Sequence, residues 1–293
     1  MRLLTFTQGG KTRIGAQIDE EVVDFSVAAP DLPTEMVVFL ESGEEAMAKA
    51  KAGVQSGKGR IAFSEVRLEA PILRPPKILA IGLNYAGHAA ENKIDPPPVP
   101  LVFNKQSLSS NGPYDPIHKP AESDQLDYEG ELAIVVGKRC RRVPREDAFQ
   151  VVAGYTIVND VSIRDWQMAK PVYPHTMGKS WDTHCPMGPV IVTSDELTDP
   201  HVLELEVTVN GETRQKANTD DFIFDVPWVI EHLSTAFTLE AGDVIPTGTP
   251  DGVGHFMDPK GYMKSGDVVK VSISGIGEIE NRVIEEPADT VSY

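Results

Sequence analysis

The sequence predicts a protein of mixed α and β structure (α+β) in which β-strands predominate. Short apolar runs rich in β-branched residues recur from residue 131 onward and are separated by turn residues. The clearest long helix spans residues 225–237, and Asn210-Gly211 between two strand patterns is a strong signal for a two-residue hairpin. The predicted strands of this region are residues 131–136, 151–158, 188–192, 203–209, 268–273 and 278–283.

The order of the elements predicts two domains. Residues 2–26 have the pattern of three short strands joined by hairpin turns, and residues 33–52 have helical composition. A stiff proline-rich connector at residues 71–76 then precedes a buried-strand pattern at residues 78–82. We therefore expect a small N-terminal, β-rich domain and a larger second domain, with bounds at residues 1–70 and 71–293.

Charge and composition exclude several classes of function. The 293 residues carry a formal net charge of −17 with a pI near 4.8, whereas nucleic-acid binding needs a basic surface. The basic run at residues 138–142 is interpreted as a solvated turn. Cys140 and Cys185 lack the spacing of a zinc site or a disulfide scaffold. Since there is no signal-peptide core and no apolar run that could cross a bilayer, we expect a cytoplasmic protein with no membrane partner.

Acidic residues alternate directly before one predicted strand, in the run Leu126-Asp127-Tyr128-Glu129-Gly130-Glu131-Leu132. In a strand, Glu129 and Glu131 point to the same face, where two carboxylates repel each other. If that face is buried, a cation must offset the repulsion, and oxygen ligands favour Mg²⁺, Mn²⁺ or Ca²⁺. Gly130 leaves room for close approach. An exposed acidic strand end is the alternative interpretation of this pattern.

Further candidates could complete such a site. Asp160 ends an apolar strand pattern, and three carboxylates on one divalent ion leave positions for a chelating 2-keto acid. Lys179, in a glycine-flanked loop, could balance the remaining negative charge, although a lone Lys is usually solvated. The hydroxyls and backbone N–H groups of residues 245–254 suit a carboxylate cradle, and a structural turn is the alternative.

A His–Glu pair is the candidate for proton transfer. His88 and Glu91 are three residues apart and share one face if their segment is helical. Glu91 would then orient His88 and raise its basicity, so that His88 removes a proton from an attacking water. A surface His–Glu pair would have the same spacing.

Together these motifs resemble the fumarylacetoacetate hydrolase superfamily, of the acylpyruvate hydrolase and 2-keto-acid-processing type. The resemblance covers essentially the whole chain, and the order and spacing of its motifs are highly specific. One departure is the run 103–107, where many members have a Lys-Pro pair, and it leaves the orientation of Lys105 open. The matching motifs are Asn84-Tyr85 with His88 and Glu91, residues 127–132, Asn159-Asp160-Val161-Ser162 with Arg164-Asp165, Gly178-Lys179-Ser180 and residues 247–254.

The resemblance implies a role for each matching position. Glu129, Glu131 and Asp160 would bind Mg²⁺ or Mn²⁺, with Ca²⁺ possible in crystals. Lys179 and Thr249 would hold the pyruvoyl end of the substrate, with Gly248 and Tyr85 as further substrate contacts. His88, Glu91 and Lys179 would be the catalytic residues. It also implies a mixed β-sheet roll with an accessory N-terminal domain, and a homodimer.

The leading hypothesis for function is hydrolytic cleavage of a C–C bond in a 2,4-diketo acid, an acylpyruvate, which gives pyruvate and a carboxylic acid. A water activated by His88 would attack the carbonyl at C4, and pyruvate would leave as an enolate. Decarboxylation of oxaloacetate and hydration or isomerisation of a 2-keto acid are alternatives on the same scaffold. A member that binds a metal or metabolite without catalysis is a further alternative.

Overall fold

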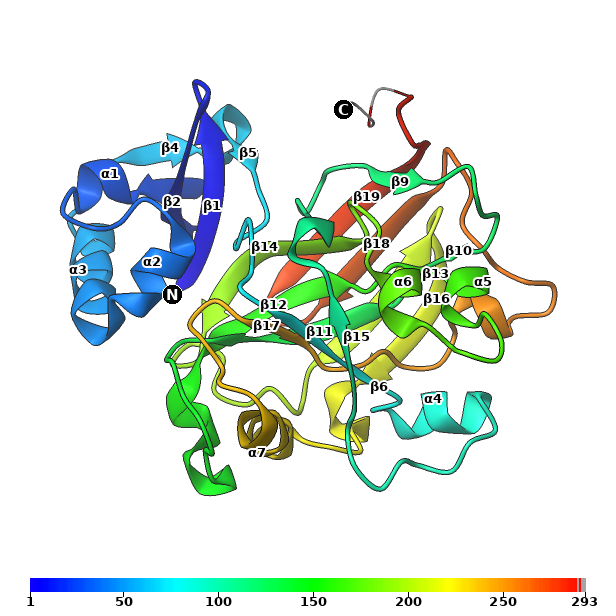
Figure 1. Cartoon of the computed structure of the whole chain (residues 1–293). Helices are drawn as coiled ribbons and strands as arrows, with labels where there is room; N and C mark the ends of the chain where they lie inside the picture. The colour runs from blue at the N-terminus through cyan, green and yellow to red at the C-terminus, as the bar shows by residue number, and fades with distance from the viewer. Residues whose placement is uncertain (289, 291–293) are drawn as a thin grey trace.

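The computed structural model describes residues 1–288 and 290, and its elements fall into an N-terminal group and a larger group (Figure 1). The N-terminal group lies at one end of the molecule, and its helices cover one side of its strands (Figure 1). Its elements are β1 (Arg2–Gln8), β2 (Lys11–Ile18), β3 (Glu21–Asp24), α1 (Phe25–Ala28), α2 (Met36–Glu41), α3 (Gly43–Gln55), β4 (Arg60–Ala62) and β5 (Arg67–Leu68).

Most strands belong to one large mixed sheet. Its main path runs β4-β3-β2-β1-β14-β12-β11-β17-β6-β7, with β5 paired to β1 and β8 paired to β14. Neighbours are mostly antiparallel, but β17 runs parallel to β6. The strands not yet defined are β6 (Ile78–Gly82), β7 (Leu101–Lys105), β8 (Ser110–Asn111), β11 (Gly130–Val136), β12 (Val152–Asn159), β14 (Cys185–Thr193) and β17 (Val244–Pro246).

A second, five-stranded sheet packs on the first. Its order is β16-β15-β18-β19-β9, and a separate two-stranded sheet pairs β10 with β13. These strands are β9 (Ile117–Lys119), β15 (Glu204–Val209), β16 (Glu212–Asn218), β18 (Val268–Ile273), β19 (Gly277–Glu285), β10 (Leu126–Asp127) and β13 (Ser162–Ile163).

The remaining α-helices belong to the larger group, and the last of them is the longest. They are α4 (Ala86–Glu91), α5 (Arg164–Gln167), α6 (His175–Lys179) and α7 (Val226–Ala236). Asp225 begins α7 as its N-cap, because its carboxylate accepts a 2.8 Å hydrogen bond from the Trp228 N–H. Among the described residues, no helix is both long and apolar enough to span a membrane.

The predicted elements and the observed ones agree closely. The six predicted strands are confirmed as β11, β12, β14, β15, β18 and β19, and residues 225–237 form α7 with its two caps. The Asn210-Gly211 turn is confirmed, since both residues have positive φ, 54° and 79°. The helical composition of residues 33–52 corresponds to two helices, α2 and α3, which are separated by a turn at Gly43, whose φ is +68°.

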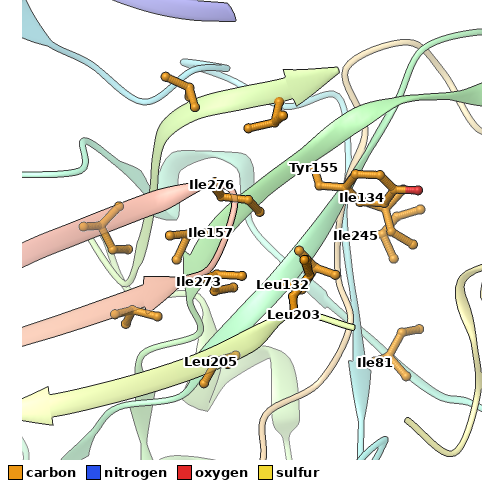
Figure 2. Packing of buried hydrophobic residues seen from close by; sticks show 14 of the residues in the cluster. Ile81, Leu132, Ile134, Tyr155, Ile157, Leu203, Leu205, Ile245, Ile273 and Ile276 are labelled. Carbon is orange, nitrogen blue, oxygen red and sulfur yellow. The ribbon is translucent and has the colours of Figure 1, made fainter. Parts of the chain in front are cut away.

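Strand β11 is buried along its whole length because it separates two cores. Leu132 and Ile134 point into the core between the two sheets, which Figure 2 shows together with Leu205 and Ile273. Ala133 and Val135 alternate with them and join a second core, formed largely by the N-terminal helices. Period-two alternation therefore places Glu131 on the second face, away from the five-stranded sheet.

The sheet is continuous across the predicted domain boundary at residue 70. Strand β1 pairs with β14, with Arg2 opposite Val192 and Leu3 opposite Ile191. The second core contains Phe25 and Phe39 as well as Val135. The division at residue 70 stays a prediction, and these contacts hold the two parts of the sequence together.

Gly130 packs directly against the second sheet, where there is no room for a larger side chain. A Cβ there would lie 2.3 Å from Val207 Cγ2 and 2.9 Å from Val271 Cγ1.

Urea denaturation of Gly130→Ala should show a free energy of unfolding lower by about 1–3 kcal/mol, the usual cost of overpacking a filled core. Val207→Ala removes the nearest clashing atom, so the double variant should lose less than the sum of the two single losses. Strictly additive losses would contradict this packing.

Candidate active site

The register of β11 and β12 brings the three predicted metal ligands together. In this antiparallel pair Gly130 lies opposite Asn159, so Glu129 and Asp160 emerge side by side at the same end. Two hydrogen bonds fix this end, from Asp160 N to Glu129 O at 2.8 Å and from Glu129 N to Asn159 Oδ1 at 3.0 Å. Carboxylate oxygens of Glu129, Glu131 and Asp160 all lie within 4.8 Å of one another and are buried.

Three buried basic side chains surround this carboxylate cluster. Lys179 Nζ contacts Glu129 Oε2 at 2.6 Å and Asp160 Oδ2 at 2.8 Å. Lys105 Nζ contacts Asp160 Oδ1 at 2.7 Å and also donates to the Lys179 backbone carbonyl. Arg164 contacts Glu129 Oε1 at 2.7 Å through Nη1. Each of these cations offsets part of the repulsion within the cluster.

Glu131 is the carboxylate of the cluster that none of these three cations contacts. In the part of the chain that the structure describes, its hydrogen-bond partner is the Gly248 backbone N–H, 2.8 Å from Oε2, and no basic side chain pairs with it. Burial and the charges of Asp160 and Glu129 raise the pKa of Glu131 well above its ordinary value. Burial also acts on Glu129, but the charges of Lys179 and Arg164 outweigh it and lower the pKa of that group.

A divalent cation fits this cluster. The donors are three carboxylates, the set that Mg²⁺, Mn²⁺ and Ca²⁺ prefer over softer metals. Within residues 1–288 and 290, no basic side chain pairs with the buried Glu131, so a bound cation would stabilise the charged form of this carboxylate. Glu129, Glu131 and Asp160 can therefore hold a divalent metal ion, as the sequence predicts.

The predicted His–Glu pair is also formed. His88 and Glu91 lie on α4, and His88 Nδ1 is 3.1 Å from Glu91 Oε2. Glu91 Oε1 in turn accepts a 3.0 Å hydrogen bond from the Gly252 N–H, which anchors the pair to the loop after β17. Asn92 Nδ2 lies 3.3 Å from His88 Nε2.

A cavity of about 400 Å³ joins the carboxylate cluster to His88. Residues of α4, α5 and α6 line it, and Figure 1 shows these three helices on the same side of the molecule, away from the N-terminal group. Lys179 and Thr249 line it, so both predicted contacts for the pyruvoyl end face the same space. Apolar walls complete it, with Ile81, Leu83, Ile94, Leu101, Phe103 and Phe256 among the lining residues.

Two predicted substrate contacts lie elsewhere. The Tyr85 side chain is fully buried outside the cavity, where its ring packs on Phe222 at 4.9 Å between centroids. Gly248 is close to the cluster, but its N–H is already donated to Glu131. Gly248 therefore positions the Glu131 carboxylate, and neither Tyr85 nor Gly248 is among the residues that line the cavity.

Several site residues carry no role in the sequence analysis. The Lys105 side chain points at Asp160, so it belongs to the site although the run 103–107 lacks the Lys-Pro pair of many family members. Arg164 belongs to a matching motif, but only the structure shows it bridging Asp127, through Nε at 2.8 Å, and Glu129. Its Nη2 atom is buried without a hydrogen-bond partner among the described residues, and Arg164 lines the cavity.

With this geometry established, similarity to known proteins identifies the family. A family model described as the C-terminal part of fumarylacetoacetate (FAA) hydrolase matches residues 77–284. The chain belongs to this family. The matched region contains the carboxylate cluster, the His88–Glu91 pair and Lys179, and the chain is an enzyme of the fumarylacetoacetate hydrolase superfamily.

Individual members resemble nearly the whole chain. Mitochondrial oxaloacetate tautomerase fahd2 from Xenopus laevis is 42% identical over 288 residues, which cover 97% of this chain and 90% of the relative. A solved fumarylacetoacetate hydrolase from Exiguobacterium antarcticum is 39% identical with a TM-score of 0.85, covering 98% of this chain and 100% of that one. A maleylpyruvate hydrolase from Sphingobium sp. SYK-6, solved with manganese(II) and pyruvate, is 34% identical with a TM-score of 0.82 and the same coverage.

The raised pKa of Glu131 predicts an unusual dependence of stability on pH. The folded, metal-free protein holds this proton more tightly than the unfolded chain, so this group lowers the free energy of unfolding as pH rises above 4.5. Denaturation of chelator-treated protein at several pH values should show this loss, and Glu131→Gln should abolish it.

Mn²⁺ should reverse the same loss, because a bound cation stabilises the charged carboxylate. We expect Mn²⁺ to raise the melting temperature of the wild type above this pH and to leave Glu131→Gln much less changed. Glu44→Gln is the matched control, since the Glu44 side chain is 88% exposed. If the wild type and Glu131→Gln have the same pH profile with and without Mn²⁺, the account of the cluster is wrong.

Proposed function

We propose that the chain is a Mg²⁺- or Mn²⁺-dependent enzyme that interconverts the keto and enol forms of oxaloacetate. The observation that carries this proposal is that the imidazole of His88, paired with Glu91, lines the same cavity as Glu129 and Glu131. Keto–enol conversion needs these two parts, a base that moves a proton and a centre that stabilises charge on the keto oxygen. The curated relative with 42% identity over 97% of the chain is named as an oxaloacetate tautomerase, which supports the choice of reaction.

The metal ion would be held by Glu129, Glu131 and Asp160. When bound, it supplies positive charge to the oxygen atoms of the 2-oxo acid. The protein itself has a net charge of −17, so a dianionic substrate needs local cations as well. Lys179 and Thr249 line the cavity beside the cluster and would bind the carboxylate next to the keto group.

Arg164 offers a site for the second carboxylate of oxaloacetate. Its Nε and Nη1 atoms are engaged by Asp127 and Glu129, while Nη2 has no partner among the described residues and the side chain lines the cavity. Gln167 Oε1 accepts from Arg164 Nη1 at 2.9 Å, which leaves the Gln167 amide N–H₂ for a ligand. An unpaired buried guanidinium nitrogen favours a ligand with an oxygen acceptor at this end of the cavity.

The His88–Glu91 pair would move the proton. With Glu91 accepting from His88 Nδ1–H, the imidazole lone pair lies on Nε2, which faces Asn92 Nδ2 at 3.3 Å. A substrate in the cavity would replace this Asn92 donor, and Nε2 would then take a proton from C3 of oxaloacetate. The electron pair of the C–H bond then forms the C2–C3 double bond, and the keto oxygen becomes an enolate oxygen. Glu91 would stabilise the His88 imidazolium. His88 Nε2 would then return the proton to the enolate oxygen on C2, which gives the enol.

Hydrolysis of an acylpyruvate is the second candidate. The solved maleylpyruvate hydrolase in complex with manganese(II) and pyruvate, at 34% identity over 98% of this chain, favours it. In this reaction His88 Nε2 would take its proton from a water that attacks the C4 carbonyl, and cleavage of the C3–C4 bond would release pyruvate. Both candidates use the same residues, so the substrate assay decides between them.

His88→Ala should lower kcat for oxaloacetate tautomerisation by about 10²- to 10⁴-fold, the usual contribution of a general base. The enol absorbance of oxaloacetate gives the rate, with Mn²⁺ affinity measured separately by calorimetry. Mn²⁺ affinity should be unchanged, because His88 contacts no carboxylate of the cluster. His232→Ala on α7, outside the cavity lining, is the control and should retain full activity.

The same two proteins should then be tested on acetylpyruvate, following the loss of the diketone absorbance. Cleavage by the wild type without catalysis of oxaloacetate tautomerisation would replace the first candidate with the second. Equal activity of His88→Ala and the wild type in both assays would remove the proposed role of the dyad.

A further inference from the structure

A buried glutamine links the carboxylate cluster to the cavity wall. Gln215 lies on β16, and its side chain is 1% exposed. Its Oε1 atom accepts a 3.0 Å hydrogen bond from the N–H of Gly130, the residue between Glu129 and Glu131. Its Nε2 atom donates at 2.8 Å both to Thr249 Oγ1 and to the Pro250 carbonyl.

Backbone atoms fix the orientation of this amide. The Gly130 N–H is a donor only, so Gln215 must present its oxygen there. The Pro250 carbonyl is an acceptor only, so Gln215 must present its N–H₂ group on the other side. Because the two constraints agree, the Gln215 atom that faces Thr249 Oγ1 is the amide nitrogen, which donates a hydrogen bond to it.

This orientation determines what the Thr249 hydroxyl can do. Its oxygen already accepts from Gln215, and its proton is donated to the Gly130 carbonyl at 3.0 Å. Thr249 also lines the cavity. A carboxylate is a stronger acceptor than a backbone carbonyl, so a bound carboxylate can draw this proton away from Gly130 while Gln215 keeps the oxygen in place.

We propose that Gln215 is a positioning residue for substrate binding, which holds the Thr249 hydroxyl as a proton donor to a carboxylate oxygen of the 2-oxo acid. The proposal rests on the proposed function in placing a 2-oxo acid carboxylate at Thr249. It gives the cavity a preference for acceptor groups at this position. Gln215 acts through Thr249 and touches no ligand.

The test is a double-mutant cycle with pyruvate as the probe. Calorimetry in the presence of Mn²⁺ gives the Kd of pyruvate for the wild type, Gln215→Met, Thr249→Val and the double variant. Each single variant should raise this Kd about tenfold, the effect of one hydrogen bond to a charged group. The double variant should bind pyruvate no more weakly than Thr249→Val alone, because in this proposal Gln215 acts on pyruvate through the Thr249 hydroxyl and not through its bonds to Gly130 and Pro250. The Kd of Mn²⁺ without pyruvate should be unchanged.

Additive losses in the double variant would overturn the proposal, because Gln215 would then act by another route such as Gly130. Unchanged pyruvate binding by Thr249→Val would overturn it as well. Gln215→Glu is the second variant; it retains an oxygen for the Gly130 N–H, replaces the donor to Thr249, and should also weaken pyruvate binding at neutral pH. Gln150→Met, at an exposed position that contacts Asp147, is the matched control for the loss of an amide.

The proposed function is tested separately in the same samples. A wild type that binds Mn²⁺ and pyruvate but leaves oxaloacetate unchanged would contradict tautomerisation and leave the role of Gln215 intact. Full tautomerase activity of the wild type, together with unweakened pyruvate binding in Gln215→Met and Gln215→Glu, would contradict the role of Gln215 and leave the proposed function intact.

Discussion

The repulsion among three buried carboxylates is the constraint on which the rest of the site depends. Glu129, Glu131 and Asp160 share a space in which their oxygens lie within 4.8 Å of one another. Burial makes each charge costly, and such a cluster persists only if cations compensate it. Lys179, Lys105 and Arg164 supply positive charge to Glu129 and Asp160. A divalent ion would supply the positive charge that Glu131 lacks among the contacts that the structure describes.

The fold holds this cluster by using both faces of one strand. The apolar residues of β11 pack into two cores, one on each face of the strand. Gly130 has no side chain, so the start of β11 can lie close to Val207 and Val271 of the second sheet. Glu129 and Glu131 lie at the start of β11, on the face that carries Ala133 and Val135, and Asp160 lies beside them at the end of β12. Function and packing therefore share the same few residues, so a change at Gly130 acts on both.

Local patterns in the sequence related Glu129 to Glu131, at the start of one strand, and His88 to Glu91, on one helix. Asp160 joins the two glutamates through the pairing of β11 with β12, and the roles of these residues as ligands and dyad stay predictions. Lys105, Arg164 and Gln215 form contacts across 55, 37 and 34 residues of sequence, and no periodicity connects such positions. The same limit applies to the fold, since the pairing of β1 with β14 depends on tertiary packing. Tyr85 and Gly248 belong to matching motifs, yet one is buried on Phe222 and the other has already donated its N–H to Glu131.

The comparisons establish the superfamily, and the chemistry within it depends on what occupies the cavity. A crystal structure of the protein with Mn²⁺ and pyruvate, using the anomalous signal of manganese, would show directly whether the three carboxylates bind the ion. We expect one manganese ion coordinated by Glu129, Glu131 and Asp160, with pyruvate bound between the ion and His88. A structure without manganese at these carboxylates, or with pyruvate bound away from the cluster, would contradict this expectation.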